Sequence, residues 1–406
     1  MTAGTAFLVL SLIFALAAAV SWGRGKAAAG KALALASFFA AVLASAWLFW
    51  LILHDRFDID YVWSYSSLDL PLVYKVSAFW AGQQGSFLLW LFFHAAAGAA
   101  LALRARLGNA GQAVFFFLQA LLAALVLFYS PFAVTEGYAP ADGAGMNPLL
   151  QDPWMAIHPP LVFFGYALLA VPYAASLGAL LSEKADSTAW LALARNWALV
   201  AWALLGAGIF VGAFWAYKVL GWGGYWAWDP VENASLLSWM VALALVHCFT
   251  VYRRRGGFKR WSVMCATLAF SFVVVGTFIT RSGVVQSVHS FAQDPVSLVI
   301  FGLIIAVSVA VSLAGVGLRW KRFESDDDIQ SMMSKNAAYY FNNVIMIVFT
   351  LMLTYMTVSS ALPSWLPFGG QSLAAQTYNA VARPVGIFYC LIIAVCPLLA
   401  WGITDR

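Results

Sequence analysis

The chain has 406 residues, of which 63% are hydrophobic and only 10% are charged. Soluble domains carry about 25% charged residues, so this composition excludes a water-soluble enzyme or binding module and indicates a chain that folds in lipid. The 22 lysines and arginines outnumber 17 acidic residues, but they lie in short segments between apolar runs, which indicates membrane topology and no nucleic-acid partner.

Eleven apolar runs are long enough to cross about 30 Å of hydrocarbon, which takes about 20 helical residues. They lie at residues 5–22, 33–53, 86–103, 112–134, 160–181, 197–217, 233–252, 261–279, 296–318, 339–360 and 385–404. Because backbone groups in lipid must pair within their own segment, we predict that all are helices. The sequence thus predicts an all-α polytopic membrane protein with a single transmembrane domain over 1–406, whose first run is a retained helix rather than a cleaved signal.

The distribution of cations predicts the orientation. An outside N-terminus and an inside C-terminus place 17 of the 22 lysines and arginines on the inner side, and the opposite orientation inverts this ratio. Since cations collect on the cytoplasmic side, we expect the first arrangement, in the inner (cytoplasmic) membrane. Three segments of functional interest then face the periplasmic side, namely 135–160, 218–233 and 280–295.

His158 lies in the first of these segments and is followed by Pro159 and Pro160. Proline suits the first turn of a helix and gives the preceding residue an extended backbone. We therefore expect His158 to be held rigidly just outside the helix at 160–181, as a metal ligand rather than as an interface histidine that caps a helix.

The second segment contains the densest aromatic stretch of the chain, residues 222–233, which we call the Trp segment. It comprises Trp222, Gly223, Gly224, Tyr225, Trp226, Ala227, Trp228, Asp229, Pro230, Val231, Glu232 and Asn233. Tryptophan also forms belts at membrane interfaces, but a belt requires neither paired glycines nor Asp-Pro and Glu-Asn. Indoles offer flat apolar surface and glycines allow close approach, so the stretch indicates a platform for a planar ligand.

The third segment begins near Arg281 and carries His289. Two imidazoles, His158 and His289, can ligate one metal from opposite sides, and flat apolar walls with two axial nitrogens suit a haem. Arg281 can pair with a haem propionate or extend toward the interface.

His247 lies 15 residues beyond Glu232, within a predicted helix. At about 1.5 Å per residue this is about 22 Å below the outer surface. An ionisable residue at this depth indicates function, and the two interpretations are a buried haem and a hydrogen bond to another helix. His94 is the other deep histidine. The four cysteines lie in apolar runs without metal-site spacing and are predicted to be buried and structural.

These features resemble the CcmF family of cytochrome c-type biogenesis proteins, haem-handling membrane proteins with a Trp-rich "WWD" segment. The Trp segment reads WGGYWAWDPVEN, His158-Pro159-Pro160 matches the first outer histidine of the family, and the stretch from Gly276 through Gly283 to His289 matches the second. Residues 75–90 resemble the segment before the third helix. The resemblance extends from about residue 40 to about residue 390.

The resemblance implies a cytochrome c haem lyase that works in a complex of several subunits. Haem b arrives on a CcmE-type chaperone at the outer face, where His158 and His289 are its axial ligands and the Trp segment its platform. A CcmH-type thiol subunit brings apocytochrome c, whose Cys-X-X-Cys-His thiols add to the haem vinyl groups. His247 matches the ligand of a separate, buried b-type haem. The sequence contains no catalytic thiol of its own, so its contribution is expected to be positioning.

Two departures from the family accompany this resemblance. Gln84 stands where the family more often has glutamate. Full-length relatives continue into further helices with a second deep histidine, whereas this sequence ends at Arg406. We expect a second subunit or a longer chain to supply that ligand, because His94 matches no ligand position of the family.

Three alternatives stand beside the lyase. A haem exporter or holder of the smaller CcmC type uses the same Trp segment, although the helix count and the His-Pro-Pro motif favour the CcmF type. A lyase dedicated to unusual haem-binding motifs is not separated by the sequence from a general one. A transporter of a non-haem substrate predicts broken helices and an ionisable midplane site.

Overall fold

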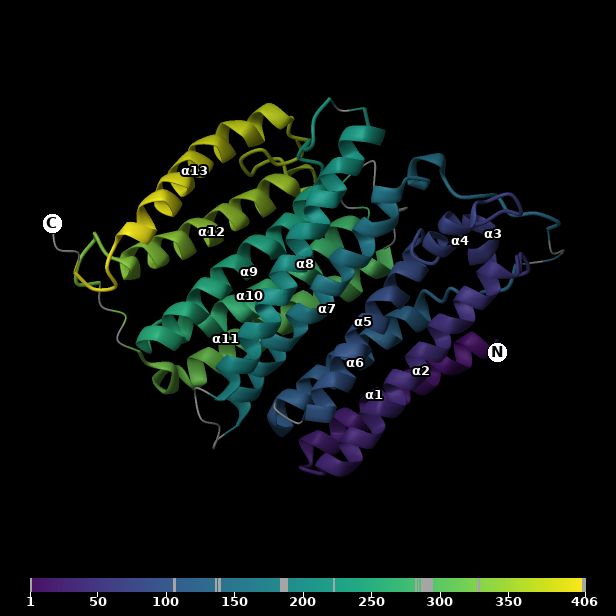
Figure 1. Ribbon diagram of the computed structural model, residues 1–406, viewed down its shortest axis with the longest axis horizontal. Helices are drawn as coiled ribbons and strands as arrows, with labels where there is room; N and C mark the ends of the chain where they lie inside the picture. Colours follow the sequence, from purple (N-terminus) through teal and green to yellow (C-terminus); the bar gives the residue numbers. More distant parts are fainter. Residues whose placement is uncertain are drawn as a thin grey trace. The chain divides into compact units, whose positions relative to one another are not determined.

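The computed structural model describes residues 2–104, 107–135, 137, 140–182, 189–221, 223–281, 283, 285, 295–325, 327 and 329–403. Over these residues the protein is built of α-helices joined by loops and short 3-10 turns, with one isolated bridge between Ile59 and Val134 (Figure 1). Eleven of the described helices are long and apolar enough to cross a membrane, which confirms the predicted all-α membrane fold.

The helices fall into two compact units. Unit 1 comprises Met1–Asp186 and Ala203–Tyr225, and unit 2 comprises Ser187–Trp202 and Trp226–Arg406. The division runs through α8 (Ala189–Val219) and through the Trp segment, between Tyr225 and Trp226. The two halves of the Trp segment therefore pack within different units.

Unit 1 is a helical bundle whose polar residues join helices inside the apolar core. Its elements are α1 (Ala3–Gly23), α2 (Ala27–Leu53), α3 (Asp60–Tyr65), α4 (Leu72–Ala78), α5 (Gln83–Arg104), α6 (Gly108–Phe128), η1 (Pro148–Leu150), α7 (Pro153–Leu181) and the second part of α8. The Gln119 amide on α6 donates to the Ser37 hydroxyl at 2.8 Å, which in turn donates to the Ser11 carbonyl at 2.8 Å. Such bonds between helices replace contacts with water, which lipid cannot supply.

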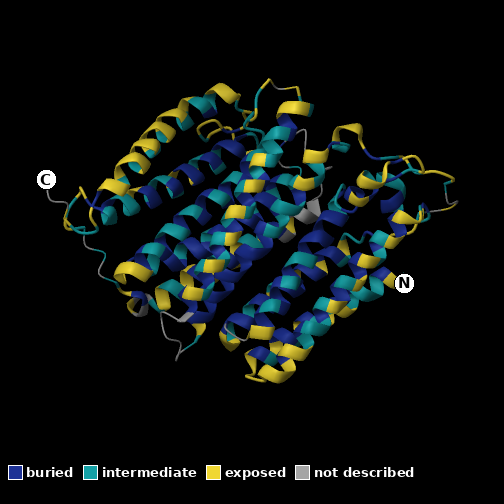
Figure 2. Ribbon diagram, viewed as in Figure 1, coloured by how far each residue is buried: buried dark blue, intermediate teal, exposed yellow. Residues whose placement is uncertain are grey.

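Unit 2 contains α9 (Pro230–Arg255) packed along α10 (Lys259–Arg281), with α12 (Lys335–Thr357) on α9 and α13 (Ala375–Val395) beside α12 (Figure 1). Its remaining elements are the first part of α8, α11 (Pro295–Leu318) and the short turns η2 (Trp320–Phe323), η3 (Ser359–Ala361) and η4 (Cys396–Leu398). Figure 2 shows that α13 is largely exposed. In a membrane protein such a face contacts lipid or another polypeptide.

The structure corrects the predicted start of the fifth span. The helix α7 begins at Pro153, because the Asp152 carboxylate accepts the Trp154 N–H at 2.9 Å and Pro153 suits the first turn. His158 therefore lies inside the helix and not just outside it. Pro159 and Pro160 follow within a continuous helix, where each omits one backbone hydrogen bond.

Two further expectations are corrected in unit 2. The helix α13 begins ten residues before the predicted position 385, so Arg383 and Pro384 lie within it rather than in an outer loop. Cys248 and Cys265 are buried as predicted, but Cys390 is exposed on α13. The start of α13 was missed for two reasons. Polar residues interrupt the apolar run before Pro384, and a proline often occupies the first turn of a helix.

Candidate functional site

His158 is held by the backbone of the neighbouring helix. Its Nδ1–H donates to the carbonyl oxygen of Gly208 on α8 at 2.7 Å. A carbonyl oxygen only accepts, so this bond places the proton on Nδ1 and leaves the lone pair on Nε2. An imidazole that donates through one nitrogen to a fixed acceptor and ligates through the other is the usual arrangement of a metal-binding histidine.

Two glycines on α8 provide the room for this imidazole. A Cβ at Gly212 would lie 2.6 Å from His158 Nδ1, and a Cβ at Gly208 would lie 2.7 Å from a methyl carbon of Val162 on α7. Gly208 and Gly212 are spaced as in the Gly-x-x-x-Gly pattern, which lets two helices approach closely. The pattern was visible in the sequence, but its meaning depends on the pairing of α7 with α8.

Two contacts join the end of α8 to the segment that begins α7, near His158. Lys218 donates to the Asp152 carboxylate at 2.6 Å, and the Trp215 indole donates to the Leu149 carbonyl at 3.0 Å. Asp152 is almost fully buried and contributes both the helix cap and an ion pair with Lys218, whose side chain is exposed. The first turns of α7, which carry His158, are therefore fixed at both sides.

The first half of the Trp segment extends α8 in unit 1. Tyr225 stacks on Tyr217 with ring centroids 4.4 Å apart and rings 14° from parallel. Gly223 has a left-handed backbone with φ of 71°, and a Cβ at Gly223 or Gly224 would meet nothing within 4 Å. That a ligand approaches these glycines stays a prediction, and Trp222 lies outside the described residues.

The second half of the Trp segment forms the capped start of α9 in unit 2. The Asp229 carboxylate accepts the Val231 N–H at 2.9 Å, and the Glu232 carboxylate accepts the Asp229 N–H at 3.1 Å, with Pro230 in the first turn. This reciprocal pattern is a capping box. The acidic residues that the sequence singled out as ligand contacts thus also have a local structural role.

Trp226 and Trp228 meet edge to face, with centroids 5.9 Å apart and an interplanar angle of 87°. The Trp228 indole donates to the Asn379 side chain at 3.0 Å. The Trp226 indole nitrogen is buried and has no hydrogen-bond partner among the described residues. The same is true of five other indole nitrogens among the described residues, those of Trp22, Trp80, Trp90, Trp190 and Trp202.

His247 lies midway along α9 and is contacted by Asn342 of α12, whose side-chain amide donates to Nδ1. This bond places the ring proton on Nε2, while Asn342 Oδ1 is buried and has no hydrogen-bond partner in the part of the chain that the structure describes. A half-turn of the amide would let Oδ1 accept from Nδ1–H and would free Nε2 for a metal. His247 therefore makes an interhelical hydrogen bond, which was one of the two interpretations. Haem ligation, the other interpretation, requires the Asn342 amide to turn.

Of the remaining predicted residues, the structure describes some and not others. Arg281 ends α10 as predicted and is buried, with 7% of its surface exposed, while His289 lies outside the described residues. His94 in unit 1 is fully packed, with its ring stacked on Phe115 at 4.2 Å. Among the described residues, no group of three histidine, cysteine or acidic side chains could hold a metal ion.

The chain is similar to proteins of cytochrome c maturation. A family model described as "Cytochrome C assembly protein" matches residues 80–286. The chain is 34% identical to cytochrome c-type biogenesis protein CcmF of Haemophilus influenzae, over 98% of this chain and 63% of that protein. It is 36% identical to cytochrome c-type biogenesis protein ccl1 of Rhodobacter capsulatus, over 97% and 62% of the two chains.

A solved structure agrees with these sequence matches. The protein described as "Cytochrome c Heme Lyase CcmF" superposes with a TM-score of 0.76 at 28% identity, over 99% of this chain and 61% of that chain. This chain thus spans less than two thirds of the length of these relatives.

Proposed function

Because this chain belongs to the cytochrome c assembly protein family, we propose that it is the haem-positioning component of a cytochrome c haem lyase. It receives haem b from a CcmE-type chaperone at the periplasmic face of the inner membrane and holds it for an apocytochrome c that a CcmH-type subunit delivers. The observation that carries this proposal is the imidazole of His158, whose Nδ1–H is bound to Gly208 and whose Nε2 carries the lone pair.

The second axial ligand of this haem in the proposal is His289, which the resemblance to CcmF supports. Arg281 pairs with a propionate in the proposal, and the Trp segment covers one side of the haem. The indole nitrogen of Trp226 has no hydrogen-bond partner among the described residues, so it is a donor that a propionate could accept from.

The chemical step is the addition of two cysteine thiols to two haem vinyl groups. In each addition the sulfur bonds to one vinyl carbon and the thiol hydrogen ends on the other, so atoms and electrons balance without an external oxidant. The described residues of this chain contribute no thiol at the His158 site. In the proposal the chain holds haem in a fixed orientation. The thiols and vinyl groups then react as if within one molecule, which lowers the entropic part of the barrier.

His247 is proposed to bind a separate b-type haem after the Asn342 amide has turned. It is the only histidine among the described residues of unit 2, so a second histidine for such a haem would have to be supplied from outside them. A further membrane subunit is the proposed source. The described spans are continuous helices, which gives no support to a transporter of the broken-helix type.

The proposal is tested by loading the purified protein with haem from a CcmE-type chaperone and recording absorption and pyridine haemochrome spectra. His158→Ala should abolish capture of haem at the outer site. His54→Ala is the matched control, because His54 is held at the end of α2 by the Trp50 carbonyl at 2.9 Å and has no role in the proposal. Normal haem spectra in the His158 variant would refute the outer site. Haem capture without thioether formation in the complete system would favour the CcmC-type holder.

A further inference from the structure

The residues of α13 are exposed or half-buried, except for one side chain that is buried. Of its residues, all of which the structure describes, Tyr378 alone is buried, with 5% of its surface exposed. Its ring stacks on the ring of Trp228 with centroids 5.5 Å apart and only 9° from parallel. The buried part of α13 is therefore used to contact the Trp segment.

The next residue of α13 makes the polar contact to the same indole. The Asn379 side-chain oxygen accepts the Trp228 Nε1–H at 3.0 Å, across 151 residues of sequence. One face of the Trp228 ring and its only donor are thus both taken by α13. A tryptophan held in this way is an anchored side chain rather than an adaptable one.

The backbone around Trp228 needs such support. Trp228 has φ of 61°, in the left-handed region that bulky side chains rarely adopt. The carboxylate of Glu232 accepts the N–H of Ala227 at 3.0 Å, and the Asn233 side chain donates to the Trp228 carbonyl at 3.1 Å. Local contacts hold the peptide groups on both sides, while α13 holds the side chain.

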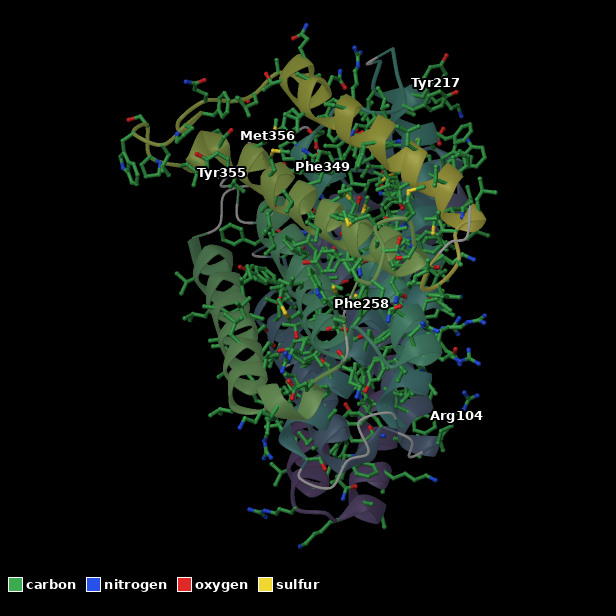
Figure 3. All side chains as sticks on the ribbon, turned by 90° about the vertical axis from the view of Figure 1, so that its left-hand side faces the viewer. Arg104, Tyr217, Phe258, Phe349, Tyr355 and Met356 are labelled. Carbon is green, nitrogen blue, oxygen red and sulfur yellow. The ribbon has the colours of Figure 1, made fainter. Side chains whose placement is uncertain are left out.

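The helix α12 connects these contacts to the rest of unit 2. The Tyr378 hydroxyl donates to the Met356 carbonyl at 3.1 Å, and Asn233 also donates to the Thr357 hydroxyl at 3.0 Å. Figure 3 labels Met356 and Phe349 on α12, the helix against which α13 lies. The end of α12 therefore receives hydrogen bonds from both α13 and the start of α9.

We propose that Tyr378 and Asn379 are positioning residues of the haem platform, which they maintain by holding Trp228 and, through its edge-to-face contact, Trp226. This inference rests on the proposed function and adds to it a helix outside the matched family region, which ends at residue 286. The two tryptophans then have different roles. Trp228 is the anchor, and Trp226, with its unpartnered indole nitrogen, contacts the haem.

The test is a titration of the purified full chain with haem, followed by the Soret absorption, in a set of paired variants. Asn379→Ala should weaken haem binding about tenfold, the effect expected when a buried donor loses its partner. Asn379→Asp keeps the acceptor and should restore most of the affinity. Tyr378→Phe keeps the stacked ring and should bind better than Tyr378→Ala. Gln376→Ala, at an exposed position one turn earlier on α13, is the control and should bind as the wild type does.

A double-variant comparison of haem affinity distinguishes a positioning role of Asn379 from a general effect on stability. If Asn379 acts through the indole nitrogen of Trp228, the Trp228→Phe variant already lacks this hydrogen bond. Adding Asn379→Ala to that variant should then change the haem affinity less than twofold. Additive losses would overturn the inference. It would also be overturned if the Asn379 and Tyr378 variants bound haem normally while Trp228→Ala did not, and in that case the proposed function would stand. If Trp228→Ala and His158→Ala both bound haem normally, the proposed function itself would fail.

Discussion

The two units each hold a histidine of interest, and they hold it by different means. In unit 1 the acceptor for His158 is a backbone carbonyl, which cannot turn, so the imidazole is fixed with its lone pair on Nε2. In unit 2 the partner of His247 is the side-chain amide of Asn342, whose two ends can serve either ring tautomer. Under the proposed function, a site that receives and releases haem benefits from the first arrangement, because the orientation of the ring is fixed before the haem arrives.

Among substitutions of residues that support the histidines, the largest expected effect comes from removing the space that the His158 imidazole needs. Gly212→Ala places a Cβ 2.6 Å from the His158 ring, which has to move and lose its bond to Gly208. We expect capture of haem at the outer site to fall about 100-fold, the upper end of the effects of disturbing a supporting residue.

The matched control for this variant is Gly302→Ala on α11, where a Cβ would meet nothing within 4 Å. Its haem capture should equal that of the wild type. Equal capture by the Gly212 and Gly302 variants would show that the close approach of α7 and α8 does not position His158.

A smaller effect is expected from removing the adjustable partner in unit 2. Asn342→Leu leaves Nδ1 of His247 without its side-chain partner, so the ring is free to rotate and the retention of a buried haem should fall about tenfold. The b-type absorbance of the purified protein measures this retention.

Asn336→Leu, near the start of the same helix, is the comparison variant and should retain haem normally. An unchanged absorbance in the Asn342 variant would mean that the amide does not orient His247. If the wild type shows no b-type absorbance at all, the buried haem has to be abandoned, and the hydrogen bond between α9 and α12 is then the whole role of His247.

The smallest effect is expected at His94, the deep histidine that neither site uses. Its ring is stacked on Phe115, and Nε2 lies 3.4 Å from the Phe115 carbonyl, so His94→Phe keeps the stacking and removes one long polar contact. Haem content should remain within twofold of the wild type, and the protein should lose about 1 kcal/mol of stability or less. A loss of b-type haem in this variant would make His94 a ligand and would remove the contrast between the two units.

The sequence predicted the eleven spans because the length of an apolar run is limited directly by the thickness of the bilayer. It misplaced His158 because Pro159 and Pro160 look like a helix start, whereas the true start is set by Asp152 and Pro153 six residues earlier. Proline preferences alone did not decide between these two starts. The side-chain cap of Asp152 did.

The contacts that support His158 and Trp228 could not be predicted from the sequence, for a different reason. Gly208 matters because α8 lies against α7, and Asn379 matters because α13 lies against a turn 151 residues away. Neither pairing follows from hydropathy, since any two apolar helices can pack in lipid. Motifs therefore indicated which residues to examine, and the fold was needed to find what holds them.

The most direct test of iron ligation by His158 is the electronic spectrum of haem bound to His158→Gly, with and without added imidazole. If His158 Nε2 binds the iron, the variant should lose the low-spin, six-coordinate spectrum of the outer-site haem, and free imidazole should restore it by occupying the vacated position beside Gly208 and Gly212. A variant whose spectrum matches that of the wild type without imidazole would contradict the central claim that His158 Nε2 binds the iron.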